Sequence, residues 1–278
     1  MKTHNVLIDT KDEKGLVYKI SKLFFEHDLN IISNNEFVDK ENEKFFMRTV
    51  ISGLVKEEQL YKELRELLGE NANIRIALPE KKNIILMVTK ESHCLGDILI
   101  RYEAGELHAN ILAVISNYDE LGSLVEKFDI PYYHISHDGL DREAHEKQIT
   151  EKLKSYKDLD LIVLAKYMRI LTPSFVDTFS EKIINIHHSF LPAFIGANPY
   201  KQAFRRGVKI IGATAHFVNN DLDEGPIITQ NTINVDHSFN WKEMQRAGRD
   251  VEKIVLSSAL KFALEDRIFV YDNKTVIL

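Results

Sequence analysis

The chain has 278 residues, of which 44% are hydrophobic and 28% are charged, and its formal net charge is -6. These values are ordinary for a soluble globular protein of one large or two medium domains. The negative charge argues against nucleic acid as a partner, because phosphate binding needs basic patches. No apolar run approaches the ~18 residues of a membrane span, so we expect no membrane partner either.

The chain contains a single cysteine, Cys94. An intrachain disulfide is therefore impossible, and a cysteine-based zinc site is disfavoured. Low cysteine usage fits a reducing compartment, and the apolar run near the N-terminus is too short for a secretory leader. We therefore expect a cytoplasmic protein.

The first 80 residues combine alternating strand patterns with two helical patterns. Strands are predicted at residues 5–10, from residue 30, at 45–50 and at 74–78, and helices from residue 16 and at 57–68. The order βαββαβ predicts a small α+β sandwich. Because Pro79–Asn83 is polar and contains a strand breaker, we place the domain boundary there, with domains at 1–80 and 83–278.

The second domain begins with continuous apolar runs separated by helical stretches. These runs lie at residues 84–88, 111–115, 130–133, 161–164 and 183–186. Such a pattern is typical of a doubly wound, mostly parallel, Rossmann-like α/β sheet that is covered on both faces. Further along the chain we expect strands at 209–218 and 227–235, a helix at 241–264 and a terminal hairpin around 272–274.

Two polar side chains lie where the strand at 183–186 ends. Asn185 and His187 are two residues apart, so on a strand they face the same side. The carboxyl ends of strands are where open α/β sheets bind ligands. His187 can donate to a developing oxyanion or move a proton near neutral pH, and Asn185 offers an uncharged N–H. The alternative is that His187 is structural, as most strand-end histidines are.

A carboxylate for the same chemistry can come from the loop after residue 218. This loop carries Asp221, Asp223 and Glu224, and the sequence does not decide which of them points inward. The alternative interpretation is an Asx-rich turn that only joins two strands. An amide, an imidazole and a carboxylate together have the polar groups needed for attack on a carbonyl carbon by water or an amine.

Two other clusters do not indicate a metal site. The histidines of His134–Asp138 have the wrong spacing for two ligands on one helix face, and the segment follows a strand end. Cys94 directly follows His93, and adjacent residues on a helix do not face each other. We therefore expect no metal, and we interpret Cys94 as a small buried or half-buried side chain.

Three separated blocks, in this order, closely resemble the folate-dependent formyltransferase family over about residues 83–278. They are Asn185–Gly196, His216–Val218 and Leu222–Ile228. The resemblance implies that Asn185, His187 and Asp223 form the catalytic trio. It also implies that the substrate is bound by Met168, Arg169, Ile170, Leu171, Gly196, His216 and Gly225, with 165–171 forming the strand end that holds the pterin ring.

The N-terminal unit resembles an ACT domain through residues 12–17, 30–31 and 45–48. By that resemblance Gly15 and Asn30 lie near a small amino-acid effector, and the protein is a homo-oligomer. The alternative is that residues 1–78 serve only for assembly. An ACT-like unit before a formyltransferase-type domain, together with the double histidine at 187–188, resembles the hydrolytic deformylase branch of the family.

The resemblance thus implies hydrolysis of 10-formyltetrahydrofolate to tetrahydrofolate and formate, which supplies formate for purine biosynthesis and balances one-carbon folate pools. Asn185 and protonated His187 would stabilise the oxyanion, and Asp223 would orient water and take its proton. No metal or redox cofactor is expected. The rival is formyl transfer to an amine, as in glycinamide ribonucleotide transformylases. Glu91 speaks against this rival because it would repel an acceptor phosphate. A folate-binding regulator without activity is the third possibility.

Overall fold

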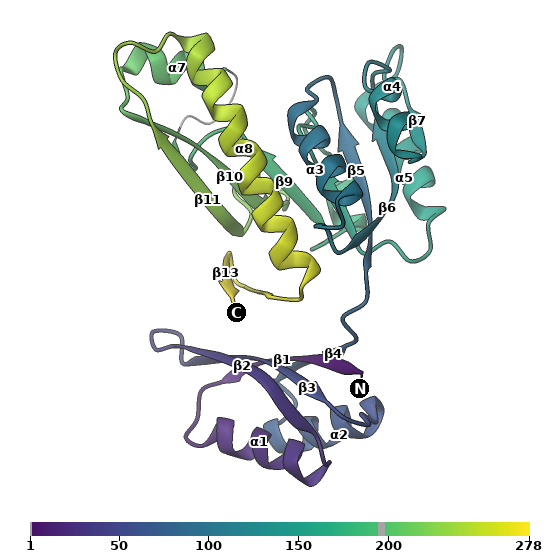
Figure 1. Ribbon diagram of the computed structural model, residues 1–278, viewed down its shortest axis with the longest axis vertical. Helices are drawn as coiled ribbons and strands as arrows, with labels where there is room; N and C mark the ends of the chain where they lie inside the picture. Colours follow the sequence, from purple (N-terminus) through teal and green to yellow (C-terminus); the bar gives the residue numbers. More distant parts are fainter. Residues whose placement is uncertain (1, 194–197) are drawn as a thin grey trace. The chain divides into compact units, whose positions relative to one another are not determined.

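The computed structural model describes residues 2–193 and 198–278. Within these residues the chain forms two compact units, each visible in Figure 1. Unit 1 is the chain up to Glu80 together with Glu265–Tyr271 and Thr275–Leu278, and unit 2 is Lys81–Leu264 with Asp272–Lys274. Among the described residues, no helix has both the length and the apolar composition that a membrane crossing requires.

Unit 1 has the predicted βαββαβ order. Its elements are β1 (Thr3–Lys11), α1 (Leu16–Glu26), β2 (Asn30–Asp39), β3 (Lys44–Ser52), α2 (Glu57–Leu68) and β4 (Asn73–Ala77). The strands form an antiparallel sheet in the order β2-β3-β1-β4. The apolar faces of both helices pack on one side of this sheet, where Phe24, Leu60 and Met47 are fully buried. The expected small sandwich is therefore confirmed.

The C-terminal hairpin covers apolar side chains on the other side of this sheet. It consists of β12 (Ile268–Tyr271) and β13 (Lys274–Ile277). Phe269 and Tyr271 pack against Leu7 and Phe46, with ring centroids 5.6 Å and 5.0 Å from that of Phe46. The sequence analysis placed the whole C-terminal segment in the second domain, 83–278, whereas most of this hairpin belongs to unit 1 in the structure. A short hairpin pattern does not indicate which sheet it covers.

Unit 2 is built on a seven-stranded sheet in the order β11-β10-β9-β8-β5-β6-β7. The strands are β5 (Lys82–Val88), β6 (Ala109–Ser116), β7 (Tyr132–His134), β8 (Leu161–Leu164), β9 (Ile183–His187), β10 (Ile210–Phe217) and β11 (Ile227–Asn234). The helices are α3 (His93–Glu103), α4 (Gly122–Val125), α5 (Arg142–Lys154), α6 (Pro173–Thr178), α7 (Pro199–Arg206) and α8 (Trp241–Leu264), with a 3-10 turn η1 (Glu126–Phe128) after α4.

The sheet is parallel from β7 to β9 and antiparallel at β10 and β11. This confirms the expected mostly parallel α/β fold. The strand order reverses next to β5, with β6 on one side and β8 on the other, and such a switch point leaves a crevice at the carboxyl ends of the strands. The long helix α8 packs on β10 and β11 (Figure 1). Asn185 and His187 lie at the carboxyl end of β9, and the segment expected to bind substrate follows the carboxyl end of β8.

Candidate active site

Asn185 on β9 lies directly opposite His216 on β10 in the antiparallel register. His216 Nδ1 donates to the Phe217 carbonyl at 2.8 Å, which leaves Nε2 as an acceptor. Asn185 Nδ2 lies 3.2 Å from this Nε2. Burial lowers the pKa of His216, so its imidazole stays neutral and able to accept. The Asn185 amide is therefore held in one orientation, with a second N–H that can serve a ligand.

His187, the last residue of β9, is buried between two acceptors. Its Nδ1 lies 3.2 Å from Asp223 Oδ1, and its Nε2 lies 3.0 Å from Ser189 Oγ. The Ser189 hydroxyl donates to the Ala193 carbonyl at 2.7 Å, so a lone pair of its oxygen can face the imidazole. Each ring nitrogen of His187 therefore faces an oxygen that can accept a hydrogen bond.

Asp223 reaches His187 from the loop between β10 and β11. Its backbone has a φ of 59°, in the left-handed region. The loop is tied to the rest of the unit by Asn220, whose Nδ2 donates to Asp177 Oδ1 at 2.9 Å. The structure thus selects Asp223 among the three carboxylates of this loop, because it is the one whose oxygen lies beside the imidazole.

The carboxyl of Asp223 stays ionised at neutral pH. Burial by itself raises the pKa of Asp223, but the hydrogen bond and the charge of His187 outweigh burial, so the pKa lies below its ordinary value. A carboxylate that stays charged beside an imidazole can accept a proton from water and can stabilise an imidazolium. The first of these roles is the one that the family resemblance implies for Asp223.

Gly225 allows the Asp223 loop to approach the sheet closely. A Cβ on Gly225 would lie 1.8 Å from the Phe217 carbonyl oxygen, and a backbone atom cannot move away as a flexible side chain can. We expect Gly225→Ala to displace Asp223 and to lower kcat by about 10²-fold, the effect of a misplacement of about 1 Å. Steady-state kinetics and thermal melting test this.

Gly96→Ala is the matched control for this substitution, because a Cβ at Gly96 would meet nothing within 4 Å. Gly96 lies inside α3, where alanine is favoured over glycine. We expect unchanged kcat and an unchanged or higher melting temperature for this control. Wild-type kcat in the Gly225→Ala variant would mean that the close approach of the loop is unnecessary.

The three side chains line a cavity of about 500 Å³. Of the residues expected to bind substrate, Met168, Arg169, Ile170, Leu171 and His216 also line it. Gly225 is instead buried against Phe217, and Gly196 lies outside the described residues. Gly15 and Asn30 belong to unit 1, where Gly15 precedes α1 and Asn30 begins β2. The structure therefore gathers the catalytic candidates and most of the substrate candidates around one cavity.

Sequence reasoning missed further residues of this cavity. They include Leu164, Val176, Ile186, His188, Asn198 and the stretch from Val218 to Leu222, whereas Lys166 and Tyr167 belong to the expected strand end at 165–171. His187 was singled out because ligands bind at the carboxyl ends of strands in open α/β sheets. The same reasoning applies to Lys166, which lies two residues after the end of β8. Burial and the neighbouring charge of Lys166 lower the pKa of His188 to about 3. His188 is therefore a neutral part of the wall at pH 7.

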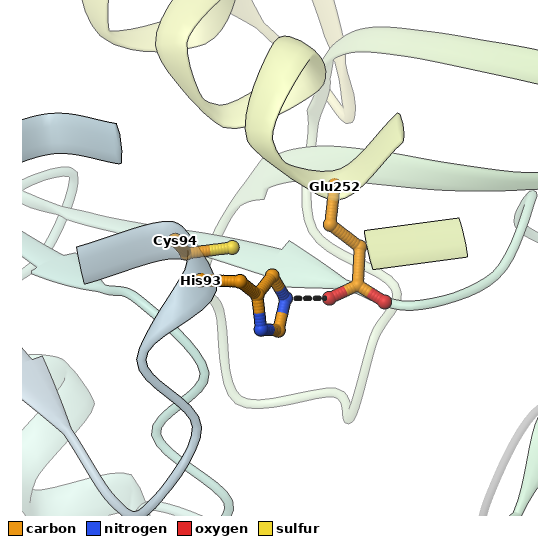
Figure 2. Close-up of side chains that lie close together, drawn as sticks. All are labelled: His93, Cys94 and Glu252. Atoms are coloured by element: carbon orange, nitrogen blue, oxygen red, sulfur yellow. Dashed lines mark hydrogen bonds and ion pairs between the residues drawn. The ribbon is translucent and has the colours of Figure 1, made fainter. Parts of the chain in front are cut away.

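A buried carboxylate, Glu252 on α8, joins several segments behind this wall. Its side chain is 1% exposed, and Oε2 lies 2.7 Å from His93 Nε2 (Figure 2) and 3.3 Å from Lys166 Nζ. The Tyr200 hydroxyl donates to Oε1 at 2.7 Å. Glu252 thus connects α8 to the start of α3, to the end of β8 and to α7.

Ligand atoms of His93, Cys94 and Glu252 lie within 4.8 Å of one another, as a metal site would require. Other contacts favour an ion-pair network instead. His93 and Glu252 are already hydrogen-bonded, and the Lys166 ammonium lies against the same carboxylate. Burial also raises the pKa of the Cys94 thiol, which disfavours the thiolate that binds metals.

The Glu252 network makes stability depend on pH under acid conditions. Burial raises the pKa of Glu252, but the His93 hydrogen bond and the Lys166 charge lower it from an ordinary 4.5 to about 2. The stabilisation is therefore complete above pH 4.5 and is lost as the pH falls towards 2. It amounts to about 3 kcal/mol. We expect the unfolding free energies of wild type and Glu252→Gln to become closer by about 3 kcal/mol as the pH falls from 4.5 to 2. Urea denaturation at several pH values measures it, and a constant difference would contradict it.

Comparisons with known proteins agree with this architecture. The family model described as formyl transferase matches residues 82–260. The formyltetrahydrofolate deformylase of Haemophilus influenzae is 57% identical over 273 residues, 98% of each chain. A crystal structure of a formyltetrahydrofolate deformylase from Pseudomonas syringae has a TM-score of 0.94 and 41% identity, covering 100% of this chain and 94% of that one. For glycinamide ribonucleotide transformylase 1 from Symbiobacterium toebii the TM-score is 0.68 and the identity 29%, covering 74% of this chain and 98% of that one.

Proposed function

The chain belongs to the formyl transferase family, and from this membership we propose that it hydrolyses 10-formyltetrahydrofolate to tetrahydrofolate and formate. The observation that carries the proposal is the imidazole–carboxylate pair of His187 and Asp223, 3.2 Å apart on the wall of the 500 Å³ cavity. Water needs only such side chains to attack an amide carbonyl. The released formate would serve purine biosynthesis, and the protein would work in the cytoplasm.

The reaction begins with attack of water on the formyl carbon. Asp223 accepts a proton from the water as the C–O bond forms, because its carboxyl is ionised at neutral pH. The carbonyl oxygen becomes an oxyanion, which Asn185 stabilises through the N–H that His216 leaves unused. One such donor contributes about 3 kcal/mol to lowering the barrier.

His187 is the second donor to the oxyanion in this scheme. The Nε2 of His187 faces Ser189 Oγ, so the formyl oxygen would share or replace Ser189 as its acceptor. The tetrahedral intermediate then collapses: the bond between carbon and N10 breaks, and N10 takes up from Asp223 the proton that water lost. The products are tetrahydrofolate and formic acid, which releases its proton to solvent and leaves as formate, and no metal or redox cofactor is required.

The experiment that tests the function uses 10-formyltetrahydrofolate and enzyme without any acceptor. Formate released at an enzyme-dependent rate supports hydrolysis. Release that needs an added amine supports formyl transfer. Binding without any turnover supports a folate-binding regulator, and each of the last two results would overturn the proposal.

Formyl transfer to a phosphorylated amine is opposed by the charges near the end of β5. Glu91 Oε2 lies 3.2 Å from Arg249 Nε, and Lys90 Nζ lies 3.0 Å from Glu120 Oε1. These two cations, Arg249 and Lys90, are already paired with carboxylates. To bind them, an acceptor phosphate would have to displace Glu91 and Glu120, whereas water needs no such site.

Unit 1 is proposed to act as an ACT-like assembly and effector unit. Among the described residues β2 is an edge strand, and Ile32 and Phe37 on it are 57% and 46% exposed. An unpaired edge with apolar side chains can pair with the same edge of a second copy. A small amino acid near Gly15 and Asn30 is the proposed effector. Calorimetric titration with amino acids and sedimentation analysis test the two roles separately; a monomer that binds none would contradict both.

A further inference from the structure

One segment of the cavity wall exposes large apolar side chains. It runs from Lys166, just after β8, to Thr172, which caps α6. Met168 is 55% exposed and Ile170 is 50% exposed, and both line the 500 Å³ cavity. A connecting segment that holds apolar side chains towards a cavity needs fixed ends, because a mobile one would have to be ordered when a ligand binds.

The start of this segment is held by Glu252. Lys166 has a φ of 66°, which is uncommon for a residue other than glycine. Its ammonium is 3% exposed and lies 3.3 Å from Glu252 Oε2. Its carbonyl accepts the Thr89 hydroxyl at 2.7 Å, at the end of the neighbouring strand β5. Both the side chain and the backbone of Lys166 are therefore fixed.

The end of the segment is held by a second buried carboxylate, Glu146 on α5. Glu146 is 5% exposed. Its two oxygens accept the Thr172 backbone N–H at 3.0 Å and 3.2 Å, and Oε2 also accepts the Thr172 hydroxyl. The same hydroxyl accepts from Phe175 N at 3.3 Å and so caps α6. Thr172 is thereby fixed to both α5 and α6.

Glu252 stabilises the fold, but stability alone does not explain why both carboxylates contact one segment. A buried ion pair such as that of Lys166 and Glu252 is often replaceable by apolar residues without loss of stability, because desolvation offsets the attraction. The two glutamates come from different helices, α5 and α8, and they meet the same seven-residue segment at its opposite ends. Their shared effect is to fix the position of that segment.

We propose that Glu146 and Glu252 are positioning residues that clamp the two ends of residues 166–172 and so keep Met168 and Ile170 presented to the pterin ring of the substrate. The inference rests on the proposed function. The two carboxylates contribute to substrate affinity, whereas Asn185, His187 and Asp223 carry out bond cleavage. The effect of removing either one therefore falls on KM and on folate binding, and only weakly on kcat.

The test uses the full chain, with tetrahydrofolate as the binding probe in calorimetry and 10-formyltetrahydrofolate as the substrate in kinetics. We expect Glu146→Gln and Glu252→Gln each to raise the Kd for tetrahydrofolate and the KM about tenfold. A loss of this size arises when the ligand must order one or two residues of the segment as it binds. We expect kcat to stay within about threefold, because the reacting groups are untouched. Glu151→Gln on α5 and Asp250→Asn on α8, both exposed, are the controls and should match wild type.

A double-mutant cycle separates the clamp from a general loss of stability. If Glu252 acts through Lys166, then Lys166→Met combined with Glu252→Gln should bind tetrahydrofolate no more weakly than the worse single variant. Additive losses would contradict this route. Should Glu252→Gln not fold, Lys166→Met carries the test, because it leaves Glu252 with its donors His93 and Tyr200.

The outcomes distinguish this inference from the proposed function. If wild type releases no formate, the proposed function fails, and the clamp fails with it. If wild type hydrolyses its substrate but folded Glu146 and Glu252 variants keep wild-type Kd and KM, only the clamp is overturned. A fall in kcat with unchanged KM would also overturn it, because that result would place the carboxylates in the chemical step.

Discussion

Replacing His187 with alanine should lower kcat for formate release by about 10²-fold or more, since both proton transfer and oxyanion stabilisation have effects of this size. His187 lies at the cavity wall, with its two ring nitrogens 3.2 Å from Asp223 Oδ1 and 3.0 Å from Ser189 Oγ. Its removal eliminates one proposed donor to the oxyanion and a close partner of Asp223 together. Affinity for tetrahydrofolate should change little, because the residues proposed to hold the pterin ring, Met168 to Leu171, are unchanged.

The measurement is single-turnover formate release together with calorimetric binding of tetrahydrofolate. His237→Ala is the control, because His237 is exposed outside the cavity. Circular dichroism shows whether the variant is folded. A folded His187→Ala protein with near-normal kcat would remove His187 from the chemistry and leave Asn185 as the proposed donor to the oxyanion.

Replacing Asp223 with asparagine should have an effect of similar or larger size. The amide keeps the shape of the carboxyl and can still accept a hydrogen bond from His187, but it cannot take a proton from water. General-base catalysis contributes about 10²- to 10⁴-fold, so kcat should fall within that range while the melting temperature stays close to that of wild type. Glu224→Gln, in the same loop but exposed and outside the residues that line the cavity, is the control and should retain activity.

The pH profile of kcat tests Asp223 as the base. The pKa of Asp223 lies below its ordinary value of 3.8, because the hydrogen bond and the charge of His187 outweigh burial. Its carboxylate therefore persists as the pH falls from 7 to 5, and Asp223 should cause no loss of kcat in that range. A loss of kcat between pH 7 and 5 that disappears in the Asp223→Asn variant would contradict this prediction.

The hydrolytic assignment also has an electrostatic basis. Two cations near the end of β5, Arg249 and Lys90, are paired with Glu91 and Glu120. His188 in the wall of the cavity is neutral at pH 7 and adds no positive charge. Water can reach a formyl group without a recognition site, whereas a phosphorylated acceptor cannot be held without one. The same fold therefore suits hydrolysis better than transfer in this chain.

Local patterns were sufficient to predict the order of the elements. Continuous apolar runs predicted the strands β5, β6, β8 and β9, because a strand buried on both faces cannot alternate. Alternation and helical spacing predicted the βαββαβ unit in the same way. Asn185 and His187 could be paired from sequence because two residues apart on a strand means one face. These inferences depend only on neighbours along the chain.

The sequence by itself determined the fold class, the strand-end pair and the family blocks, since each depends on periodicity or on a contiguous motif. Only the tertiary structure decided that Asp223, rather than Asp221 or Glu224, meets the imidazole, since neighbouring carboxylates in a loop look alike until the backbone directs one inward. It also decided that Glu146 and Glu252 meet the two ends of one segment, and that the terminal hairpin packs on the first sheet. Such contacts join residues far apart in the chain, and no local period records them.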